Sequence, residues 1–364
     1  MNSMAFAWLK RMWLVGAALM VVFLTAYCQP QSTAPKAELP MLGARIDNTS
    51  VSGISSGAYM AGQFQMAHAN LVTGAAIIAG GPYGCSESVF ADAIPGPGTA
   101  FLNLSKAVNG CMLNLLSVWG VGDPGALAEK AKKRSAEGQI GAIADVMSDR
   151  VYLFSGQADR TVVPAIVNAA ANFYAKLGVP AANIKFVSNL PAGHAFVTED
   201  AGGACSRSDE PYVVDCDYDQ AGDLLRHIYG NLNPRSAQPT GEYVIFSQQP
   251  FIAGKNTGLA SEGVVYVPRA CRAQGGCSVH IAFHGCAQNR QTVGDAFITS
   301  TGFARWADTN NLIVLYPQVA TTALNPQGCW DWWGYTGHEY LTRQAPQIVA
   351  VERMLEELRR GPAS

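Results

Sequence analysis

The sequence predicts an α/β protein in which helices cover one sheet. Short apolar runs of the kind found in buried strands alternate with segments whose apolar residues recur at helical spacing. The 364 residues are 49% hydrophobic and only 14% charged, which excludes a largely disordered chain. Nine cysteines accompany an N-terminal segment that is typical of export, so we also expect disulfide bonds.

The predicted strands and helices alternate along the chain. A strand over residues 44–53 runs into a sharp turn, and residues 56–69 follow it with few helix breakers. Residues 230–242 are polar and rich in Pro and Gly, which is typical of either a domain linker or a long connection. The later strands are too few for a separate sheet, so we expect one continuous sheet in a single domain. Further strands are expected at 75–79, 151–154, 184–187, 243–246, 263–267, 279–283 and 313–316, and further helices at 165–177, 301–309 and 345–360.

Residues 1–28 are typical of a secretory signal peptide. Lys10 and Arg11 precede an apolar run of about fifteen residues, which is short for a bilayer span of about 20. An uncleaved membrane anchor is the alternative, and Cys28 also allows a lipoprotein junction, although Tyr27 stands where a small residue is usual. Residues 29–40 are predicted to be a flexible tether. We therefore expect an exported protein, secreted or periplasmic, whose domain covers 41–364 without stable membrane insertion after processing.

The charge balance excludes a large class of partners. The chain has 25 Lys and Arg residues against 27 Asp and Glu residues, a formal net charge of -2. No basic surface is predicted that could bind nucleic acid. We expect a monomer with no nucleic-acid partner.

Eight cysteines remain when Cys28 is set aside, an even number that suits an oxidising compartment. A structural zinc site is the alternative, but the sequence has no CxxC spacing, so we predict no metal site. Pairing of near neighbours leaves one distant pair. The expected disulfides are Cys85–Cys111, Cys205–Cys216, Cys271–Cys277 and Cys286–Cys329.

The first sign of catalysis is the segment Gly53-Ile54-Ser55-Ser56-Gly57. This G-x-S-x-G pattern lies between a predicted strand and a predicted helix, the setting that a nucleophile elbow requires. The glycines permit a tight turn that lifts the serine hydroxyl out of the sheet, and the helix N-terminus adds positive potential. An ordinary Gly/Ser turn is the alternative. Ser55 is the candidate nucleophile because neither Ser52 nor Ser56 has glycines at both flanking positions.

A base and an acid for this serine follow in the order Ser, Asp, His. Asp159 lies in the loop after the strand at 151–154, and His194 lies in the loop after the strand at 184–187. Either residue alone is more often structural. The carboxyl ends of parallel strands share one edge of a sheet, so the three side chains are predicted to meet there as a catalytic triad.

The oxyanion-binding loop is absent from its usual place before the elbow. A candidate comes later, where the strand at 279–283 runs into His284-Gly285-Cys286. In an ordinary α/β-hydrolase this strand, its loop and the elements after it precede the elbow. The sequence therefore predicts a circularly permuted α/β-hydrolase fold.

The segments GISSGAYM, FHGCAQ and GCWDWWGY, with the Asp159 and His194 loops, together resemble the catalytic domain of type II polyhydroxyalkanoate depolymerases. The resemblance covers roughly residues 42–360. It implies cleavage of poly(3-hydroxybutyrate) or its oligomers by Ser55 as nucleophile, His194 as base and Asp159 as its orienting acid. It also implies that the N–H groups of Ser56 and Cys286 form the oxyanion hole. Such a mechanism requires no cofactor.

The segment from Gly328 to Tyr335 holds three tryptophans, Trp330, Trp332 and Trp333. They are either a core aromatic cluster or an apolar wall for a polyester chain, which offers methyl groups and ester carbonyls but no charge. The resemblance favours at least one of them in a substrate crevice. A Cys286–Cys329 bridge would tie this segment to the oxyanion loop.

Two other functions remain open from the sequence. The first is a carboxylesterase for other esters, such as acetyl or feruloyl groups on polysaccharide. The second is a non-catalytic binding protein on a hydrolase scaffold, against which the intact Ser55, Asp159 and His194 argue. A lipase is disfavoured because no long apolar lid is evident.

Overall fold

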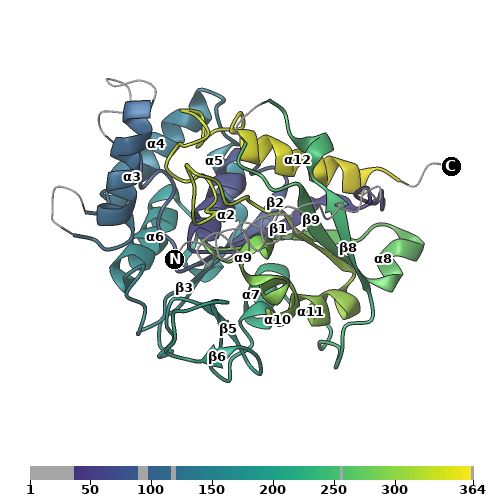
Figure 1. Cartoon of the computed structure of the whole chain (residues 1–364). Helices are drawn as coiled ribbons and strands as arrows, with labels where there is room; N and C mark the ends of the chain where they lie inside the picture. Colours follow the sequence, from purple (N-terminus) through teal and green to yellow (C-terminus); the bar gives the residue numbers. More distant parts are fainter. Residues whose placement is uncertain (1–36, 89–96, 116–119, 255–256, 362–364) are drawn as a thin grey trace, which may run out of the picture. The chain divides into compact units, whose positions relative to one another are not determined.

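One eight-stranded sheet with the order β4-β3-β2-β1-β10-β11-β9-β8 organises the computed structural model (Figure 1). The structure describes residues 37–88, 97–115, 120–254 and 257–361. Neighbours from β4 to β11 in this order run parallel, and β9 and β8 continue the sheet antiparallel. The predicted continuous sheet is confirmed. Its strands are β1 (Arg45–Ile54), β2 (Val72–Ile78), β3 (Arg150–Phe154), β4 (Ile184–Val187), β8 (Glu242–Ser247), β9 (Glu262–Val267), β10 (Ser278–Phe283) and β11 (Leu312–Tyr316).

Helices cover both faces of this sheet because its central strands are apolar on both sides. Every residue of β10 and β11 is buried, as parallel strands between two helix layers require. Figure 1 shows α2 and α12 on one face and α7, α10 and α11 on the other. The helices are α2 (Ser56–Ala67), α3 (Pro97–Cys111), α4 (Pro124–Ala136), α5 (Ile143–Ser148), α6 (Pro164–Leu177), α7 (Gln220–Tyr229), α8 (Arg269–Gln274), α9 (Arg290–Val293), α10 (Ala296–Ser300), α11 (Phe303–Asn310) and α12 (Pro346–Arg359).

The connectivity is that of a permuted hydrolase sheet. If the chain is read from β8 to β11 and then from β1 to β4, strands follow one another across the sheet, apart from an exchange of β10 and β11. The end of α12 lies beside the entry to β1, where the N–H groups of Leu42 and Ala44 both donate to the Leu358 carbonyl. This adjacency allows the same sheet to form from either connectivity.

A small second sheet follows β4 in the sequence and was not predicted. It has the order β5-β7-β6, built from β5 (Phe196–Thr198), β6 (Gly203–Ala204) and β7 (Val213–Asp215). The Cys205–Cys216 disulfide lies within this segment. The small sheet therefore directly follows the His194 loop.

Part of the predicted tether belongs to the fold. The compact unit begins at Ala37, whose carbonyl accepts the Ser247 N–H at 2.9 Å, and Leu39 is buried in the core. Burying the apolar Leu39 side chain is more favourable in free energy than leaving it in solvent, so this part of the predicted tether packs on the domain. The predicted signal peptide, Cys28 and the tether up to residue 36 lie outside the described residues.

The structure joins the cysteines in the four pairs expected from their spacing. Two of the bridges, Cys205–Cys216 and Cys271–Cys277, close short local loops. The other two, Cys85–Cys111 and Cys286–Cys329, fasten loops at the carboxyl edge of the sheet to neighbouring segments. Within the described residues, no helix is both long enough and apolar enough to cross a bilayer.

A buried histidine between the two central strands predicts that acid destabilises the fold. His280 on β10 is fully buried, with its ring nitrogens 2.7 Å from Ser50 Oγ and 2.8 Å from Ser52 Oγ on β1. Burial lowers its pKa from 6.5 to about 3. Below pH 6.5 the unfolded chain therefore binds a proton that the folded chain refuses, so stability falls as the pH falls.

We expect His280→Gln, which does not titrate, to weaken this dependence. Between pH 6.5 and 4.5 its free energy of unfolding should fall by about 2.5 kcal/mol less than that of the wild type. Urea unfolding at a series of pH values measures the difference. Equal pH dependence of the two proteins would contradict the assignment of a neutral buried His280.

Candidate active site

Ser55 stands in a strained turn between β1 and α2. Its backbone has φ 57° and ψ -121°, a left-handed region that non-glycine residues rarely adopt. The Ser55 N–H donates to the Ile78 carbonyl at 3.0 Å, which ties the turn to the end of β2. Ser55 is largely buried, with 9% of its surface exposed. This is the geometry that the nucleophile elbow predicts.

The two glycines of the pattern are required by close backbone packing. A Cβ on Gly53 would lie 2.1 Å from the Gly57 carbonyl oxygen. A Cβ on Gly57 would lie 2.3 Å from the Phe283 oxygen and 2.4 Å from the His284 oxygen. The first contact closes the elbow, and the second brings α2 against the end of β10.

We therefore expect Gly57→Ala to destabilise the fold by about 1–3 kcal/mol or more, because backbone atoms cannot move aside as a flexible side chain can. Gly62→Ala in the same helix is the matched control. Its new Cβ would meet Ile77 Cδ1 at 3.6 Å and the Tyr174 hydroxyl at 3.7 Å, which are ordinary contacts. Urea unfolding compares the two, and equal stability of both variants would contradict this account of the elbow.

Asp159 and His194 meet at the same edge of the sheet. His194 Nδ1 lies 2.8 Å from Asp159 Oδ2, while Asp159 Oδ1 accepts the N–H groups of Thr161 at 2.8 Å and Val162 at 2.9 Å. Asp159 is completely buried and His194 is 6% exposed. With Asp159 ionised, Nδ1–H of His194 donates to the carboxylate, which leaves Nε2 as the free basic nitrogen.

The loops that carry these residues are held together by their backbones. The Ala158 N–H donates to the Ala192 carbonyl at 3.0 Å, and a Cβ on Gly156 would lie 2.2 Å from the same oxygen. The His194 N–H donates to Ser208 Oγ at 2.7 Å. The His194–Asp159 pair is therefore positioned by main-chain contacts and does not depend on its own hydrogen bond alone.

The HGC loop lies directly beside Ser55. A Cβ placed on Gly285 would lie 3.5 Å from Ser55 Cβ, so the loop and the elbow are in contact. Among the described residues, neither the Ser56 N–H nor the Cys286 N–H donates to a protein acceptor. Ser56 N–H is also at the N-terminus of α2, where the helix dipole favours negative charge. Two such donors are what an oxyanion hole needs.

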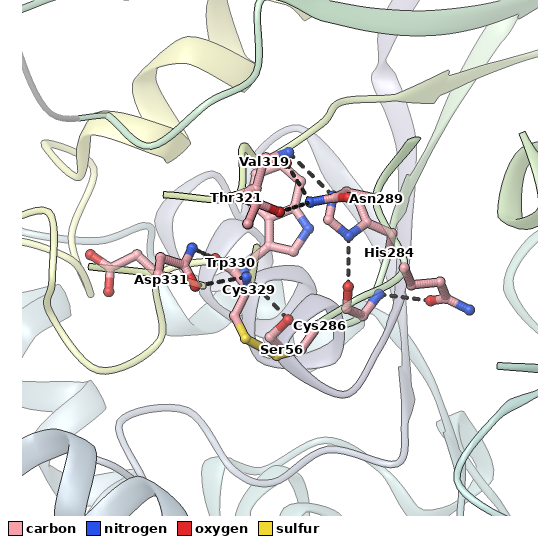
Figure 2. Close-up of a disulfide and its surroundings, with 12 residues drawn as sticks. Ser56, His284, Cys286, Asn289, Val319, Thr321, Cys329, Trp330 and Asp331 are labelled. Carbon is pink, nitrogen blue, oxygen red and sulfur yellow. Dashed lines mark hydrogen bonds between the residues drawn. A yellow bond between two sulfur atoms is a disulfide. The ribbon is translucent and has the colours of Figure 1, made fainter. Parts of the chain in front are cut away.

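His284 supports this loop as a neutral, buried side chain (Figure 2). Its Nε2 accepts the Val319 N–H at 3.2 Å, which leaves Nδ1–H to donate to the Gly285 carbonyl at 2.7 Å. Burial lowers the pKa of His284 from 6.5 to about 4, partly opposed by the bond to Gly285. His284 therefore fixes the Gly285 carbonyl at neutral pH.

The Cys286–Cys329 disulfide joins the HGC loop, the candidate oxyanion loop, to the tryptophan segment, as Figure 2 shows. Beside it, the Trp330 N–H donates to Ser56 Oγ at 3.3 Å. Asn325 holds the other side of the bridge, donating to the Cys329 carbonyl at 2.7 Å and accepting the Cys329 N–H at 3.0 Å. Elbow, oxyanion loop and tryptophan segment thus form one connected unit.

The tryptophans do not share one environment. Trp330 has no exposed surface and packs edge-on against Phe283, with ring centroids 4.9 Å apart. Trp330 therefore belongs to a core aromatic cluster, the alternative that the sequence also allowed, because its neighbours cover its whole surface. Trp332 stacks on Tyr59 of α2 with centroids 4.1 Å apart, and Trp333 packs edge-on against Trp332. These two are 5% and 8% exposed.

Sequence reasoning missed the polar contacts that shape the tryptophan segment. The Asp331 carboxylate accepts the N–H groups of Gly334 at 2.7 Å, Tyr335 at 3.0 Å and Thr336 at 2.9 Å. Burial raises the pKa of Asp331, and these hydrogen bonds oppose the rise. The only signal in the sequence that could have indicated this turn is an Asp that stands three to five residues before the N–H groups it accepts.

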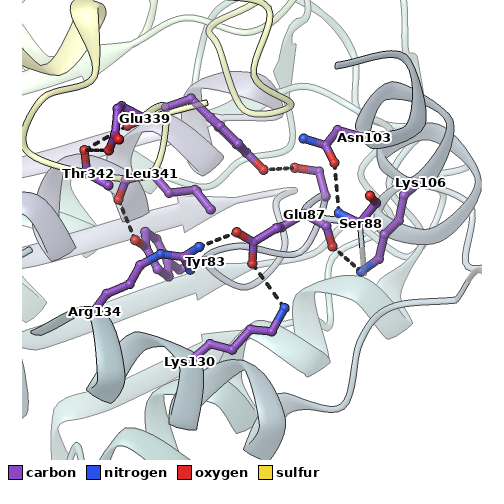
Figure 3. A network of polar contacts seen from close by, with 12 residues as sticks. Tyr83, Glu87, Ser88, Asn103, Lys106, Lys130, Arg134, Glu339, Leu341 and Thr342 are labelled. Atoms are coloured by element: carbon purple, nitrogen blue, oxygen red, sulfur yellow. Dashed lines mark hydrogen bonds and ion pairs between the residues drawn. The ribbon is translucent and has the colours of Figure 1, made fainter. Parts of the chain in front are cut away.

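A second missed network joins the loop after β2 to α4 and to Leu341, which follows the tryptophan segment (Figure 3). The Tyr83 hydroxyl donates to the Leu341 carbonyl at 2.5 Å. Glu87 forms ion pairs with Arg134 and, at 3.1 Å, with Lys130. These partners are more than forty positions from Glu87, so no local pattern in the sequence indicates them.

Side chains that could bind a metal ion are not clustered in the part of the chain that the structure describes. Within the described ranges, no three His, Cys, Asp or Glu side chains are arranged to hold a metal ion. The groups that the site offers for catalysis are the side chains of Ser55, His194 and Asp159 and the N–H groups of Ser56 and Cys286.

Comparison with known proteins identifies relatives in sequence and structure. A poly(3-hydroxybutyrate) depolymerase of Delftia acidovorans is 38% identical over 341 residues, which cover 92% of this chain and 64% of that protein. A polyhydroxybutyrate depolymerase of Talaromyces funiculosus is 34% identical over 343 residues, 89% of this chain and 93% of the relative. This chain thus spans less than two thirds of the length of the Delftia protein. No protein-family model matches the sequence.

Solved structures agree with these sequence relatives. A PHB depolymerase from Penicillium funiculosum superposes with a TM-score of 0.76 at 32% identity, covering 89% of this chain and 99% of the other. A serine-to-alanine variant of a PHB depolymerase, complexed with an R3HB trimer, matches with the same scores and coverage. The permuted α/β-hydrolase fold and the near-complete alignment together show that this chain belongs to the polyhydroxybutyrate depolymerase family.

Proposed function

We propose that this protein is a serine esterase that cleaves the ester bonds of poly(3-hydroxybutyrate) or its oligomers. The observation that carries the proposal is the strained Ser55 elbow, which adjoins the HGC loop at the edge where Asp159 holds His194, with N–H groups of Ser56 and Cys286 that have no acceptor among the described residues. A binding protein has no need of this arrangement. A strained serine beside two unpaired amides is what acyl transfer requires.

The mechanism proceeds through an acyl-enzyme. His194 Nε2 takes the Ser55 proton as Ser55 Oγ attacks the ester carbonyl carbon, and the amides of Ser56 and Cys286 bind the resulting oxyanion. Each such donor contributes about 2.7–4 kcal/mol of transition-state stabilisation. The imidazolium then protonates the departing alcohol oxygen. Water, deprotonated by His194, then attacks the acyl carbon, and the imidazolium returns this proton to Ser55 Oγ as the acyl–serine bond breaks and the hydroxybutyrate acid is released.

The relatives and the apolar surroundings support the substrate class. The related structure that holds an R3HB trimer is 99% covered by this chain. Trp332 and Trp333 remain candidates for an apolar wall, because each retains some exposed surface next to the elbow helix. A neutral polyester suits such a wall.

Export to an oxidising compartment is part of the proposal. Four disulfides join the described cysteines, and disulfides persist in secreted and periplasmic proteins but rarely in the cytosol. The basic and apolar start of the sequence supports the same location. Amino-terminal sequencing of the protein recovered outside the cytoplasm tests cleavage of the signal.

The substrate proposal is tested by product analysis. The purified protein is incubated with 3-hydroxybutyrate trimer and, separately, with amorphous polymer, and the products are identified by mass spectrometry. We expect release of monomer and dimer from both. Cleavage of p-nitrophenyl esters with no release from either substrate would retain the serine esterase and move the substrate to other carboxylic esters.

A further inference from the structure

We infer that Gln288 is a positioning residue that holds the oxyanion loop and the His194 loop at a fixed separation. The inference rests on the proposed function and deepens it. The Gln288 side chain is 1% exposed. Its Oε1 accepts the Gly285 N–H at 2.8 Å, and its Nε2 donates to the carbonyls of Pro211 at 3.1 Å and Tyr212 at 3.0 Å.

One end of this amide orients the peptides that lead to the oxyanion donor. The Gly285 N–H is held by Gln288, and the Gly285 carbonyl by His284 Nδ1–H at 2.7 Å. The Cys286 N–H shares its planar peptide unit with the Gly285 carbonyl and points the opposite way. Fixing both polar groups of Gly285 therefore fixes the direction of the Cys286 N–H beside Ser55.

The other end reaches the segment that braces the catalytic histidine. The Tyr212 carbonyl, which accepts from Gln288, also accepts the Phe196 N–H at 2.8 Å, two residues beyond His194. In the same segment, Ser208 Oγ accepts the His194 N–H at 2.7 Å. Gln288 thus links the oxyanion loop to the 208–212 segment, which in turn holds His194 and Phe196, so it influences the distance from His194 to the oxyanion hole.

Only an amide of this length satisfies all three backbone groups. Gln offers one acceptor oxygen and two donor hydrogens, whereas ionised Glu has no donor and Met has no donor and only a weakly accepting sulfur. The sequence separations of 76 and 77 residues show that these contacts are tertiary and are not part of a local turn. A displacement of about 1 Å at a reacting group lowers the rate by about 100-fold.

The chain offers a matched control in Gln248, which is completely buried. Its Oε1 accepts the Gln318 N–H at 3.0 Å, and its Nε2 donates to the carbonyls of Ala260 at 2.8 Å and Gln318 at 2.9 Å. The number and kind of hydrogen bonds equal those of Gln288. Gln248 follows β8, however, on the antiparallel side of the sheet, and bonds to neither the elbow nor the His194 loop. It reaches the HGC loop only indirectly, through Gln318 and the Val319 N–H that donates to His284.

The test compares Gln288→Met with Gln248→Met in the full chain, using a p-nitrophenyl ester of a short acid. Both variants should lose thermal stability to a similar extent. We expect Gln288→Met alone to lower kcat, by about 10- to 100-fold, with KM within about threefold of the wild type. Gln288→Glu and Gln248→Glu form a second pair. Gln288→Glu keeps the acceptor for Gly285, so its kcat should lie between those of Gln288→Met and the wild type.

The outcomes separate the inference from the proposed function. A wild-type kcat in Gln288→Met, or an equal loss of kcat in the Gln248 variant, would reduce Gln288 to a structural role. If Gln288→Met does not fold, the kcat values of Gln288→Glu and Gln248→Glu are compared instead. An unchanged kcat in Gln288→Glu then overturns the inference. Absence of Ser55-dependent ester cleavage by the wild type would contradict the proposed function, and the inference with it.

Discussion

Ser55→Ala is expected to lower ester hydrolysis by at least about ten-thousand-fold while the fold stays intact. The variant removes the only atom that can form the acyl-enzyme. Alanine and serine adopt a positive φ equally poorly, so the strain at φ 57° is unchanged. Within the described residues the Ser55 hydroxyl donates no hydrogen bond that would be lost. Steady-state hydrolysis of a p-nitrophenyl ester, with thermal unfolding of the same samples, measures both effects.

Ser52→Ala is the control for this experiment. Ser52 lies three residues earlier on β1, and its hydroxyl is 2.8 Å from His280 Nε2. It has no part in the proposed acyl transfer. Its loss should reduce stability by about 1 kcal/mol and leave kcat near that of the wild type. Substantial activity in Ser55→Ala, or a comparable loss in Ser52→Ala, would overturn the assignment of the nucleophile.

Asp159→Asn is expected to lower kcat by about ten-thousand-fold, with little change in KM. The reason is specific to the contacts of this carboxylate. The N–H groups of Thr161 and Val162 donate to Oδ1, so the amide oxygen of the introduced asparagine would be held at that position. The amide NH₂ would then occupy the Oδ2 position and donate to His194 Nδ1. His194 would be forced into the tautomer with its proton on Nε2, where it cannot accept from Ser55.

The matched control is Asp123→Asn at the N-terminus of α4. Asp123 Oδ1 accepts the Ala126 N–H at 2.8 Å in a helix cap, and Asn caps helices as well as Asp. This variant should keep wild-type kcat and stability. Retention of more than about one tenth of the wild-type kcat in Asp159→Asn would show that Asp159 does not set the tautomer of His194.

The placement of Ser55, Asp159 and His194 at one edge could be predicted because it follows from the sheet. Ser55, Asp159 and His194 each lie in the turn or loop that follows a strand, and parallel strands end at one edge. The strands themselves were evident as short, apolar, β-branched runs. The helix at α3 was not, because Gly98, Asn103 and Gly110 lower its helix propensity.

The supporting contacts could not be predicted, because each joins residues that lie far apart in the sequence. The bonds from Gln288 to residues 211 and 212 depend on how two loops approach, which no local pattern encodes. The same holds for the burial of Trp330, since composition identifies a tryptophan cluster but not which ring faces the core. Local sequence determined the reacting groups, and tertiary packing determined their support.

The most direct test of the central claim is to trap the acyl-enzyme. Wild-type protein is mixed rapidly with 3-hydroxybutyrate trimer and quenched in acid, and its peptides are analysed by mass spectrometry. The account predicts a hydroxybutyryl ester on the peptide that contains Ser55, with none on the same peptide of Ser55→Ala. Turnover of the trimer with acylation at another residue, or undiminished turnover by Ser55→Ala, would contradict it.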